Sequence, residues 1–445
     1  MPTDAASNVS RHDSTTPSAV KNVVIIGCGI IGATIAYELS HIPGLHITVL
    51  DRQRPATEST GAALGVLMGA ISQKKKGRAW AMRDASLRRY ATLIPELEST
   101  LGRSLPVNRD GIVLIQFDES GAEETPHETD AVAERPALWN NRWQPLVELR
   151  QSQGWTLECW DQEQLRSRCP QIGDCLGDRP IVGAVYSPQD LQINPVALTE
   201  ALVEAAQING VQFDFAAPVT ALATHDPRDQ PEISVVGDLV GDRQSSINLS
   251  EQKSPSSASN SASNDSALQS PPYLVHTPEQ QYDADWVIMS AGLGSAQLTQ
   301  SIHKPLDVRP VLGQAVRLHV PTPMGQPEFQ PVISGHDIHI VPLGAEEYWV
   351  GATVEFPDDA GEVCADETLL QEVLTGAIAL CPALAEATII EHWSGQRPRP
   401  WNQAAPVIEP VEGYPQVWLA TAHYRNGVLL APATAQIIRS VLESA

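Results

Sequence analysis

Three closely spaced glycines near the start of the chain have the spacing of a dinucleotide-binding loop. They are Gly27, Gly29 and Gly32, in the segment GCGIIG. The first permits a tight turn, the second lets the backbone approach a pyrophosphate, and the third lets a helix pack against a sheet. Asp51 follows where a carboxylate would accept a hydrogen bond from a ribose hydroxyl. These residues predict binding of NAD or FAD, and their spacing alone does not separate the two.

Two arginines near the C-terminus have the chemistry to bind a carboxylate. Arg397 lies in the segment QRPRP, and Arg425 lies in HYRNG. A guanidinium group can make two parallel hydrogen bonds to a carboxylate, which a lysine cannot do with the same geometry. An ion pair, at the surface or within the structure, is the alternative for each arginine taken alone. The glycine-containing loop ahead of a helix favours a functional role for Arg425.

The glycine loop is positioned by a predicted βαβ unit. An apolar strand over 23–26 precedes the loop, a helix runs through Ser40, and a second apolar strand over 46–50 ends at Asp51. This order of elements places the loop at the start of a helix, where backbone N–H groups face an anion. The combination makes the dinucleotide prediction stronger than the glycines alone.

Two further segments are predicted to contact the same dinucleotide. An apolar strand over 284–292 ends in Ala291 and Gly292, which would bring backbone beside the ligand. The segment 54–70 is rich in Ala, Gly and Leu, and small residues allow a flat ligand to approach the backbone closely. A plain loop leading into a helix is the alternative for 54–70.

The rest of the chain predicts a second, sheet-based domain and the helices that cover both domains. Strands are indicated by β-branched and aromatic residues between turn signals, and helices by apolar residues at helical spacing. The predicted strands are 105–117, 211–215, 311–320, 337–355 with a turn at Gly344-Ala345, and 417–420; the predicted helices are 73–97, 161–168, 195–210, 367–380 and one from Ala431 or Pro432.

Composition and charge limit the classes of function. The chain has 445 residues, of which 42% are hydrophobic and 18% charged, and its formal net charge is -24. No apolar run approaches the ~18 to 20 residues that span a bilayer, so we expect no membrane span. Binding to nucleic acid or to an anionic membrane needs basic surface, so the negative charge argues against both.

Two segments and the cysteines bear on order and compartment. Residues 1–20 lack the apolar core of a secretory signal and are predicted to be a disordered tail. The segment from about 226 to 272 is rich in Ser, Asn and Pro and is predicted to be a disordered insert. The six cysteines form no CxxC pair. They indicate free thiols in a reducing cytoplasm and no metal site.

Beyond these features, the order of several segments resembles the FAD-dependent amino acid oxidases of the D-amino acid oxidase family, and within it the glycine oxidases of thiamine biosynthesis. The resemblance runs from about Lys21 to the C-terminus, and HYRNGVLLAP is its most specific part. The other segments that carry it are VVIIGCGIIGATIAYEL, STGAALGVL, SAGLGSAQL, PVLGQAVRL, HIVPLGAEEYWVGAT and SGQRPRP.

The resemblance implies an α/β fold in which a Rossmann-like FAD-binding domain is interleaved with a mainly antiparallel-sheet substrate domain. Residues 21–95, 180–305 and 400–445 would form the FAD-binding domain. Residues 96–179 and 306–399 would form the substrate-binding domain.

The resemblance also implies site residues. Arg397 and Arg425 match the arginines that hold substrate, with Arg425 expected to bind the carboxylate, and His339 stands where the family often has an active-site Tyr. Asp51 replaces the more usual Glu, and Ala422 replaces a Gly. The segment around Arg397 lacks the cysteine that binds flavin covalently in sarcosine oxidases, so non-covalent FAD is expected. The matched FAD contacts are Ile30, Ile31, Asp51, Arg52, Ser59, Thr60, Leu64, Gly65, Val66, Val219, His423, Tyr424, Arg425, Asn426, Gly427, Val428 and Leu429.

The activity implied is oxidation of glycine, sarcosine or small D-amino acids by hydride transfer to FAD. O2 would then accept the electrons and give H2O2, and the glycine imine would serve thiamine biosynthesis. Two alternatives stay open: an FAD-dependent dehydrogenase that passes electrons to a quinone, and a non-catalytic FAD-binding protein. The sequence leaves the oligomeric state open, with a homo-oligomer among the choices.

Overall fold

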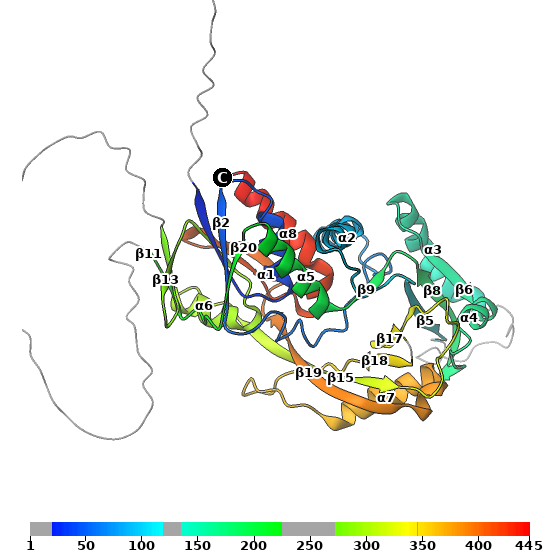
Figure 1. The fold of residues 1–445 in the computed structure, drawn as a ribbon. Helices are drawn as coiled ribbons and strands as arrows, with labels where there is room; N and C mark the ends of the chain where they lie inside the picture. Colours follow the sequence, from blue (N-terminus) through cyan, green and yellow to red (C-terminus); the bar gives the residue numbers. More distant parts are fainter. Residues whose placement is uncertain (1–19, 119–134, 225–271, 345) are drawn as a thin grey trace, which may run out of the picture.

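The computed structural model describes residues 20–118, 135–224, 272–344 and 346–445 (Figure 1). The predicted N-terminal tail, apart from Val20, and almost all of the predicted insert lie outside the described residues. The fold class is the predicted one. A mainly parallel sheet and a mainly antiparallel sheet are built from alternating segments of the chain.

In the part of the chain that the structure describes, the first sheet has six strands and contains the predicted βαβ unit. All neighbouring strands are parallel except the last pair, which forms an antiparallel hairpin. Helix α1 (Ile30–Leu39) follows the glycine loop and connects the first two strands of the chain. In order across the sheet, the strands are β10 (Gln212–Phe215), β2 (Leu45–Asp51), β1 (Lys21–Ile26), β14 (Trp286–Met289), β21 (Tyr414–Thr421) and β20 (Val407–Val411).

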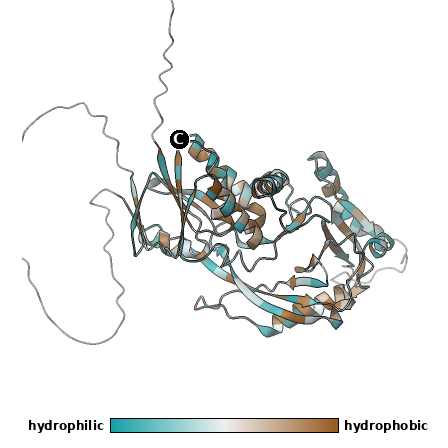
Figure 2. Cartoon of the chain, in the orientation of Figure 1, coloured by the Kyte–Doolittle hydropathy of each residue, from teal (hydrophilic) through white to brown (hydrophobic). Residues whose placement is uncertain are grey.

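Both faces of this sheet are covered, which explains the unbroken apolar sequence of β1. Val23 and Ile25 belong to the core shared with the helices, whereas Val24 and Ile26 belong to the core on the opposite face. Figure 2 shows the hydrophobic residues of α1 and α8 among the helices of the first face. That face carries α1, α2 (Arg78–Leu101), α5 (Pro195–Ile208) and α8 (Gly427–Glu443); the other carries α6 (Ser295–Ser301) and strands β11 (Ala221–Thr224), β12 (Tyr273–His276) and β13 (Gln281–Ala284).

Within the described residues, the second sheet has nine strands, and only the pair β16–β5 is parallel. Helix α7 (Glu367–Leu380), with the bounds that the sequence predicted, packs Ala377 and Leu380 into the core of one face. The small apolar cluster of Leu64, Ala315 and Val341 lies on the other face. The strands are β19 (Thr388–Pro400), β15 (Val308–His319), β18 (Glu347–Gly351), β17 (Ile338–Gly344), β16 (Val332–Gly335), β5 (Ile112–Phe117), β8 (Arg179–Ser187), β6 (Glu158–Asp161) and β7 (Cys175–Leu176).

Two elements cross the predicted divisions of the chain. The sequence placed residues from 180 onward in the FAD-binding domain. Strand β8 nevertheless pairs with β5 and β6, so it belongs to the nine-stranded sheet. Helix α2 continues past 95 to Leu101 as one helix, because its buried face packs on the core of the first sheet as far as Leu97. Three short strands, β3 (Val66–Leu67), β9 (Leu191–Ile193) and β4 (Val107–Asn108), form a small sheet of their own. The remaining α-helices of the described residues are α3 (Arg135–Ser152) and α4 (Gln162–Arg168).

The last helix begins earlier than its proline suggested. The sequence predicts a start at Ala431 or Pro432, but α8 starts at Gly427 and contains Pro432. A proline inside a helix leaves the carbonyl four residues earlier without its usual N–H donor. Here that carbonyl is Val428 O, and the buried Tyr90 hydroxyl donates to it at 2.5 Å. This bond from α2 compensates for the missing helical one.

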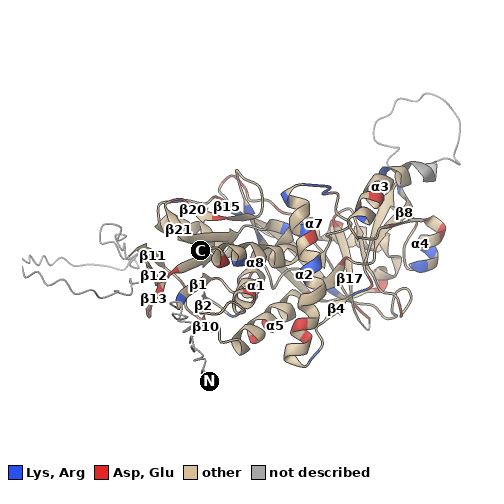
Figure 3. Ribbon diagram, turned by 90° about the horizontal axis from the view of Figure 1, so that it is seen from above, with Lys and Arg blue, Asp and Glu red and all other residues tan. Residues whose placement is uncertain are grey.

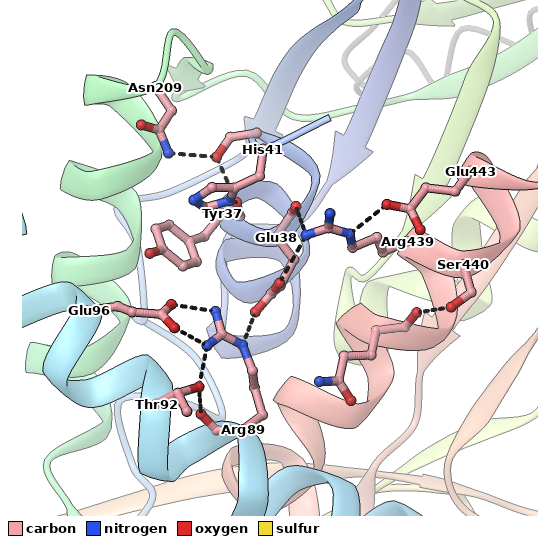
Figure 4. Close-up of polar contacts among 12 residues, drawn as sticks. Tyr37, Glu38, His41, Arg89, Thr92, Glu96, Asn209, Arg439, Ser440 and Glu443 are labelled. Carbon is pink, nitrogen blue, oxygen red and sulfur yellow. Dashed lines mark hydrogen bonds and ion pairs between the residues drawn. The ribbon is translucent and has the colours of Figure 1, made fainter. Parts of the chain in front are cut away.

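Figure 3 marks the positions of Lys, Arg, Asp and Glu along the ribbon, and few of these residues are buried within the described part of the chain. One cluster of them connects three helices. Glu38 of α1 is buried and accepts a hydrogen bond from Arg89 of α2 at 2.6 Å, while Arg439 of α8 approaches it at 3.7 Å (Figure 4). Arg89 also pairs with Glu96 at 2.7 Å. Within the described residues, no helix has the length and apolarity that crossing a bilayer requires.

Candidate active site

A cavity of about 1030 Å³ lies at the carboxyl ends of the parallel strands. The residues that follow β1, β2, β14 and β21 line one side of it, and residues of β15, β17 and β19 line another. Open α/β sheets bind their ligands at this edge. The cavity is therefore shared between the two sheets.

The glycine loop forms the cavity wall at the start of α1. Gly27 has φ +101°, a conformation that favours glycine, and a Cβ there would lie 2.7 Å from Ser290 O. Gly29 is the N-cap of α1 and lines the cavity; beyond its chain neighbours, a Cβ there would meet only Thr60 Oγ1, at 3.1 Å. A Cβ at Gly32 would lie 1.9 Å from Gly27 O. Gly27 therefore serves the turn and its close packing against Ser290, Gly32 serves packing of the helix, and Gly29 leaves room for a ligand.

Asp51 lines the cavity at the end of β2 and also holds the glycine loop. Its Oδ2 accepts a hydrogen bond from Cys28 N at 2.6 Å, and its Oδ1 accepts one from Gln53 N at 2.8 Å. Burial raises the pKa of Asp51, although these two bonds act in the opposite direction. Burial and the nearby Asp51 raise the pKa of the Cys28 thiol, so this cysteine stays protonated and unreactive.

Most of the predicted FAD contacts are brought together in this one cavity. Two are not among its lining residues: Gly32, which packs the helix, and Asn426, whose Oδ1 accepts a hydrogen bond from Arg83 Nη2 at 3.1 Å. Those that line the cavity are Gly27, Gly29, Ile30, Ile31, Asp51, Arg52, Ser59, Thr60, Leu64, Gly65, Val66, Val219, Ala291, Gly292, His423, Tyr424, Arg425, Gly427, Val428 and Leu429.

Arg397 lines the same cavity from β19. Its Nη1 donates to two backbone carbonyls, Leu312 O and Thr353 O, each at 3.0 Å. The guanidinium lies against Gly313, where a Cβ would be 2.2 Å from Nη2. Burial and the positive charge of Arg425 lower the pKa of Arg397, but arginine remains protonated in proteins. Arg397 is thus a cation held in a fixed orientation at the cavity wall.

Arg425 lines the cavity as well, but it already has a carboxylate partner. Its Nη2 donates to Asp337 Oδ1 at 2.9 Å, and the two side chains are 34% and 72% exposed. Burial raises the pKa of Asp337, but the hydrogen bond and charge of Arg425 outweigh it, so the net pKa is lowered. A substrate carboxylate that binds Arg425 must therefore compete with Asp337.

His339 lines the cavity from β17, near both arginines. Its Nδ1 lies 3.0 Å from Ser334 Oγ. Burial and the positive charges of Arg425 and Arg397 lower the pKa of His339 to about 4, against the pull of Asp337. The imidazole is therefore neutral at pH 7. A neutral ring can donate and accept hydrogen bonds, but a group with this pKa is a weak base.

This lowered pKa predicts a loss of stability in mild acid. Between pH 6.5 and 4 the unfolded chain binds a proton at His339 and the folded chain does not, so stability falls as the pH decreases through this window. At pH 5 the loss is about 2 kcal/mol. We expect a His339→Gln variant to lose correspondingly less stability between about pH 7.5 and 5, as measured by urea unfolding. Equal losses in the two proteins would contradict the assignment.

Several residues that shape the site had no signal in the sequence. Gly313 leaves space for the Arg397 guanidinium, and Thr353 O accepts a hydrogen bond from it. Asp337 pairs with Arg425, and Ser290 Oγ donates to Gly27 O at 3.0 Å. Each acts on a residue that is far away in the chain. The segment PVLGQAVRL does contain Gly313, but nothing local indicates which side chain it must accommodate.

Ala422 follows β21, at the position where the resemblance leads us to expect glycine. It has φ +55° and is buried in the core of the first sheet. This left-handed conformation is one that glycine adopts at little cost and alanine does not. The surrounding packing thus holds Ala422 in the conformation that places the next residues, His423 and Tyr424, at the cavity.

The fold and the cavity are those of a flavoprotein built on two sheets, and comparison with known proteins agrees. The family model described as FAD dependent oxidoreductase (DAO) matches residues 22–249 and 258–440. The chain belongs to this family of FAD-binding oxidoreductases. The glycine cradle fits that cofactor, because Gly29 has no side chain at the start of α1 and, beyond its chain neighbours, only Thr60 Oγ1 lies within 4 Å of the place its Cβ would take.

Among known proteins, the chain is similar to a ThiO/ThiG protein and to glycine oxidases. The chain is 29% identical over 426 residues to the bifunctional protein ThiO/ThiG of Synechocystis sp., with 95% of the chain and 51% of that protein covered. It therefore spans about half the length of this relative. It is 23% identical over 425 residues to the glycine oxidase of Geobacillus kaustophilus, covering 95% of the chain and 93% of the relative. The crystal structure of glycine oxidase from that organism has a TM-score of 0.70 at 19% identity, with 95% of each chain covered, which shows the shared fold.

Proposed function

We propose that the protein oxidises glycine and other small amino acids, such as sarcosine and small D-amino acids, with non-covalent FAD and O2. The observation that carries the proposal is that Arg397 and Arg425, from separate segments, line the cavity that the glycine loop also lines. A binding protein without activity has no need of two arginines beside the cofactor site. The net reaction converts glycine or a D-amino acid, O2 and water into 2-oxo acid, ammonia and H2O2; sarcosine would release methylamine in place of ammonia.

In this proposal Arg397 is the main partner of the substrate carboxylate, in place of Arg425 expected from the sequence. Arg397 Nη1 is held by two carbonyls, so its orientation is set before substrate binds. Arg425 must first give up Asp337, which costs part of the binding energy. A fixed carboxylate limits where the amine and the Cα–H bond can lie, and such positioning lowers the entropic part of the barrier.

FAD, when bound, supplies the acceptor for the hydride of the substrate Cα–H bond. The neutral His339 can hydrogen-bond to the amine without repelling it, because its pKa of about 4 keeps the imidazole uncharged. Apolar residues such as Leu64 and Ala352 line the same cavity and limit the water that reaches the substrate. No side chain of the site is needed as a general base when the amine arrives neutral.

The biological role is also a proposal. A relative named ThiO/ThiG suggests that the glycine imine supplies thiamine biosynthesis. All six cysteines are free thiols, which supports a reducing, cytoplasmic location.

The test of the proposed function uses the purified holoprotein with glycine under anaerobic conditions. We expect glycine to bleach the yellow flavin, and air to restore the colour with release of H2O2. Bleaching followed by reoxidation with a quinone, but not with air, would identify a dehydrogenase instead. A flavin that no small amino acid reduces would indicate a non-catalytic FAD-binding protein.

The flavin is expected to be released by acid precipitation, because no cysteine flanks Arg397 at the cavity. The measurement is the flavin absorbance of the supernatant relative to that of the pellet. Colour that stays with the denatured protein would demonstrate a covalent link.

The ion pair between Asp337 and Arg425 predicts a gain in affinity. Replacing Asp337 by Asn removes the competing charge, so we expect the KM for glycine to fall by about two- to fivefold, the equivalent of a surface ion pair of roughly 0.5 to 1 kcal/mol. Asp174→Asn, which removes the exposed partner of Arg166 and concerns no residue of the cavity lining, serves as the matched control. An unchanged or higher KM in Asp337→Asn would mean that Arg425 does not bind the carboxylate.

A further inference from the structure

A buried carboxylate lies behind Arg397, outside the cavity lining. Glu355 follows β18 and is 5% exposed. A carboxylate so far from solvent is retained only where hydrogen bonds satisfy its oxygens. Since it does not reach the cavity, its role must act through its neighbours.

Three donors converge on the two oxygens of Glu355. Oε1 accepts hydrogen bonds from Gln314 Nε2 at 3.0 Å and from the Thr353 hydroxyl, and Oε2 accepts one from Asp366 N at 2.8 Å. All three are groups that donate, so an ionised carboxylate matches them. A glutamine at this position would direct its own NH2 group at one of them.

The backbone around Glu355 includes both carbonyls that hold Arg397. Leu312 and Glu355 exchange two backbone hydrogen bonds at 2.9 and 3.0 Å, and Thr353 N donates to Gln314 O at 3.2 Å. The hydroxyl of Thr353 in turn accepts from Gln314 N at 2.8 Å. Glu355 thus binds, through its backbone or its side chain, each of the two residues whose carbonyl oxygens accept from Arg397 Nη1.

We propose that Glu355 is a positioning residue for Arg397 and thereby sets the affinity of the site for the substrate carboxylate. Its charge favours the nearby guanidinium, and its hydrogen bonds fix the strand β15 and the segment after β18 against each other. A misplacement of about 1 Å in a group that orients substrate can cost about 100-fold in rate. This inference rests on the proposed function, because it assumes that Arg397 binds a carboxylate.

The test compares holoenzyme variants by two measurements: the KM for glycine and the Kd for acetate, followed by the change in the flavin spectrum. Acetate carries the carboxylate without the reacting amine. For Glu355→Gln we expect both constants to rise by about tenfold, corresponding to about 1.4 kcal/mol, while FAD content changes little. We expect kcat at saturating glycine to fall as well, because a displaced Arg397 orients the Cα–H bond less well. Glu347→Gln, which removes the partner of Arg317 on the same sheet, is the control and should leave both constants unchanged.

A second pair of variants keeps the inference testable if Glu355→Gln does not fold. Thr353→Val removes the hydroxyl that donates to Glu355, and Thr353→Ser retains it. We expect weaker acetate binding in Thr353→Val and recovery in Thr353→Ser. A purely structural role would lower thermal stability in Thr353→Val without changing the Kd for acetate, and that result would overturn the inference.

Failure of the inference and failure of the proposed function give different results. If wild-type protein binds acetate and oxidises glycine, and Glu355→Gln does both with wild-type constants, only the positioning role is wrong. If wild-type protein neither binds acetate nor is reduced by glycine, the proposed function itself is wrong.

Discussion

An Arg397→Ala variant is expected to raise the KM for glycine by about tenfold to 150-fold. A charge-assisted hydrogen-bonded contact contributes roughly 1.5 to 3 kcal/mol, which corresponds to this range. We also expect slower flavin reduction at saturating glycine, because the substrate loses the contact that orients its Cα–H bond. Stopped-flow reduction of the flavin under anaerobic conditions measures both effects.

The flavin should remain bound in this variant, since Arg397 lies on β19 and the glycine loop lies on the other sheet. Arg317→Ala, on the adjacent strand β15 with its guanidinium paired to Glu347, is the matched control and should keep wild-type kinetics. Arg425→Ala should have a smaller effect than Arg397→Ala because Asp337 already occupies that arginine. A larger effect of Arg425→Ala than of Arg397→Ala would identify Arg425 as the main carboxylate partner. Wild-type kinetics in both variants would remove the case for an amino acid substrate.

Substituting Gly29 by valine should abolish retention of FAD while the fold survives. Gly29 has φ -75°, which valine can adopt, and its Cβ would come no closer than 3.1 Å to Thr60 Oγ1. The side chain would occupy space where the pyrophosphate approaches the start of α1. A conflict of about 3 kcal/mol weakens binding more than 100-fold, so we expect colourless protein with wild-type far-UV circular dichroism.

Substitutions of two further glycines serve as controls for this experiment. Gly102→Asn, at the C-cap of α2 with φ 64° and ψ 24°, should keep FAD, because asparagine tolerates the left-handed conformation. Gly32→Val should fail to fold, because even a Cβ would lie 1.9 Å from Gly27 O. If Gly29→Val retained the flavin at wild-type content, the dinucleotide would not bind at the start of α1.

Local patterns were sufficient for the elements whose signals lie within a few residues. The glycine loop, the apolar runs on either side of it and Asp51 predicted the βαβ unit, and the spacing of apolar residues predicted α7 with its observed bounds. Asp161 was predicted near the start of a short helix, and its side chain caps α4. The short strands β12 and β13 were missed, because four-residue strands carry too little periodicity.

The sequence by itself also determined which residues could bind a cofactor and a carboxylate, since glycine spacing and guanidinium chemistry are local properties. Only the tertiary structure decided which groups each arginine contacts. Arg425 meets Asp337, 88 positions away, and Arg397 meets the carbonyl of Leu312, 85 positions away. Such contacts depend on how strands of two sheets are brought together, and no periodicity or spacing along the chain encodes them. The helix start at Gly427 has the same origin, because the donor that compensates for Pro432 is a tyrosine on another helix.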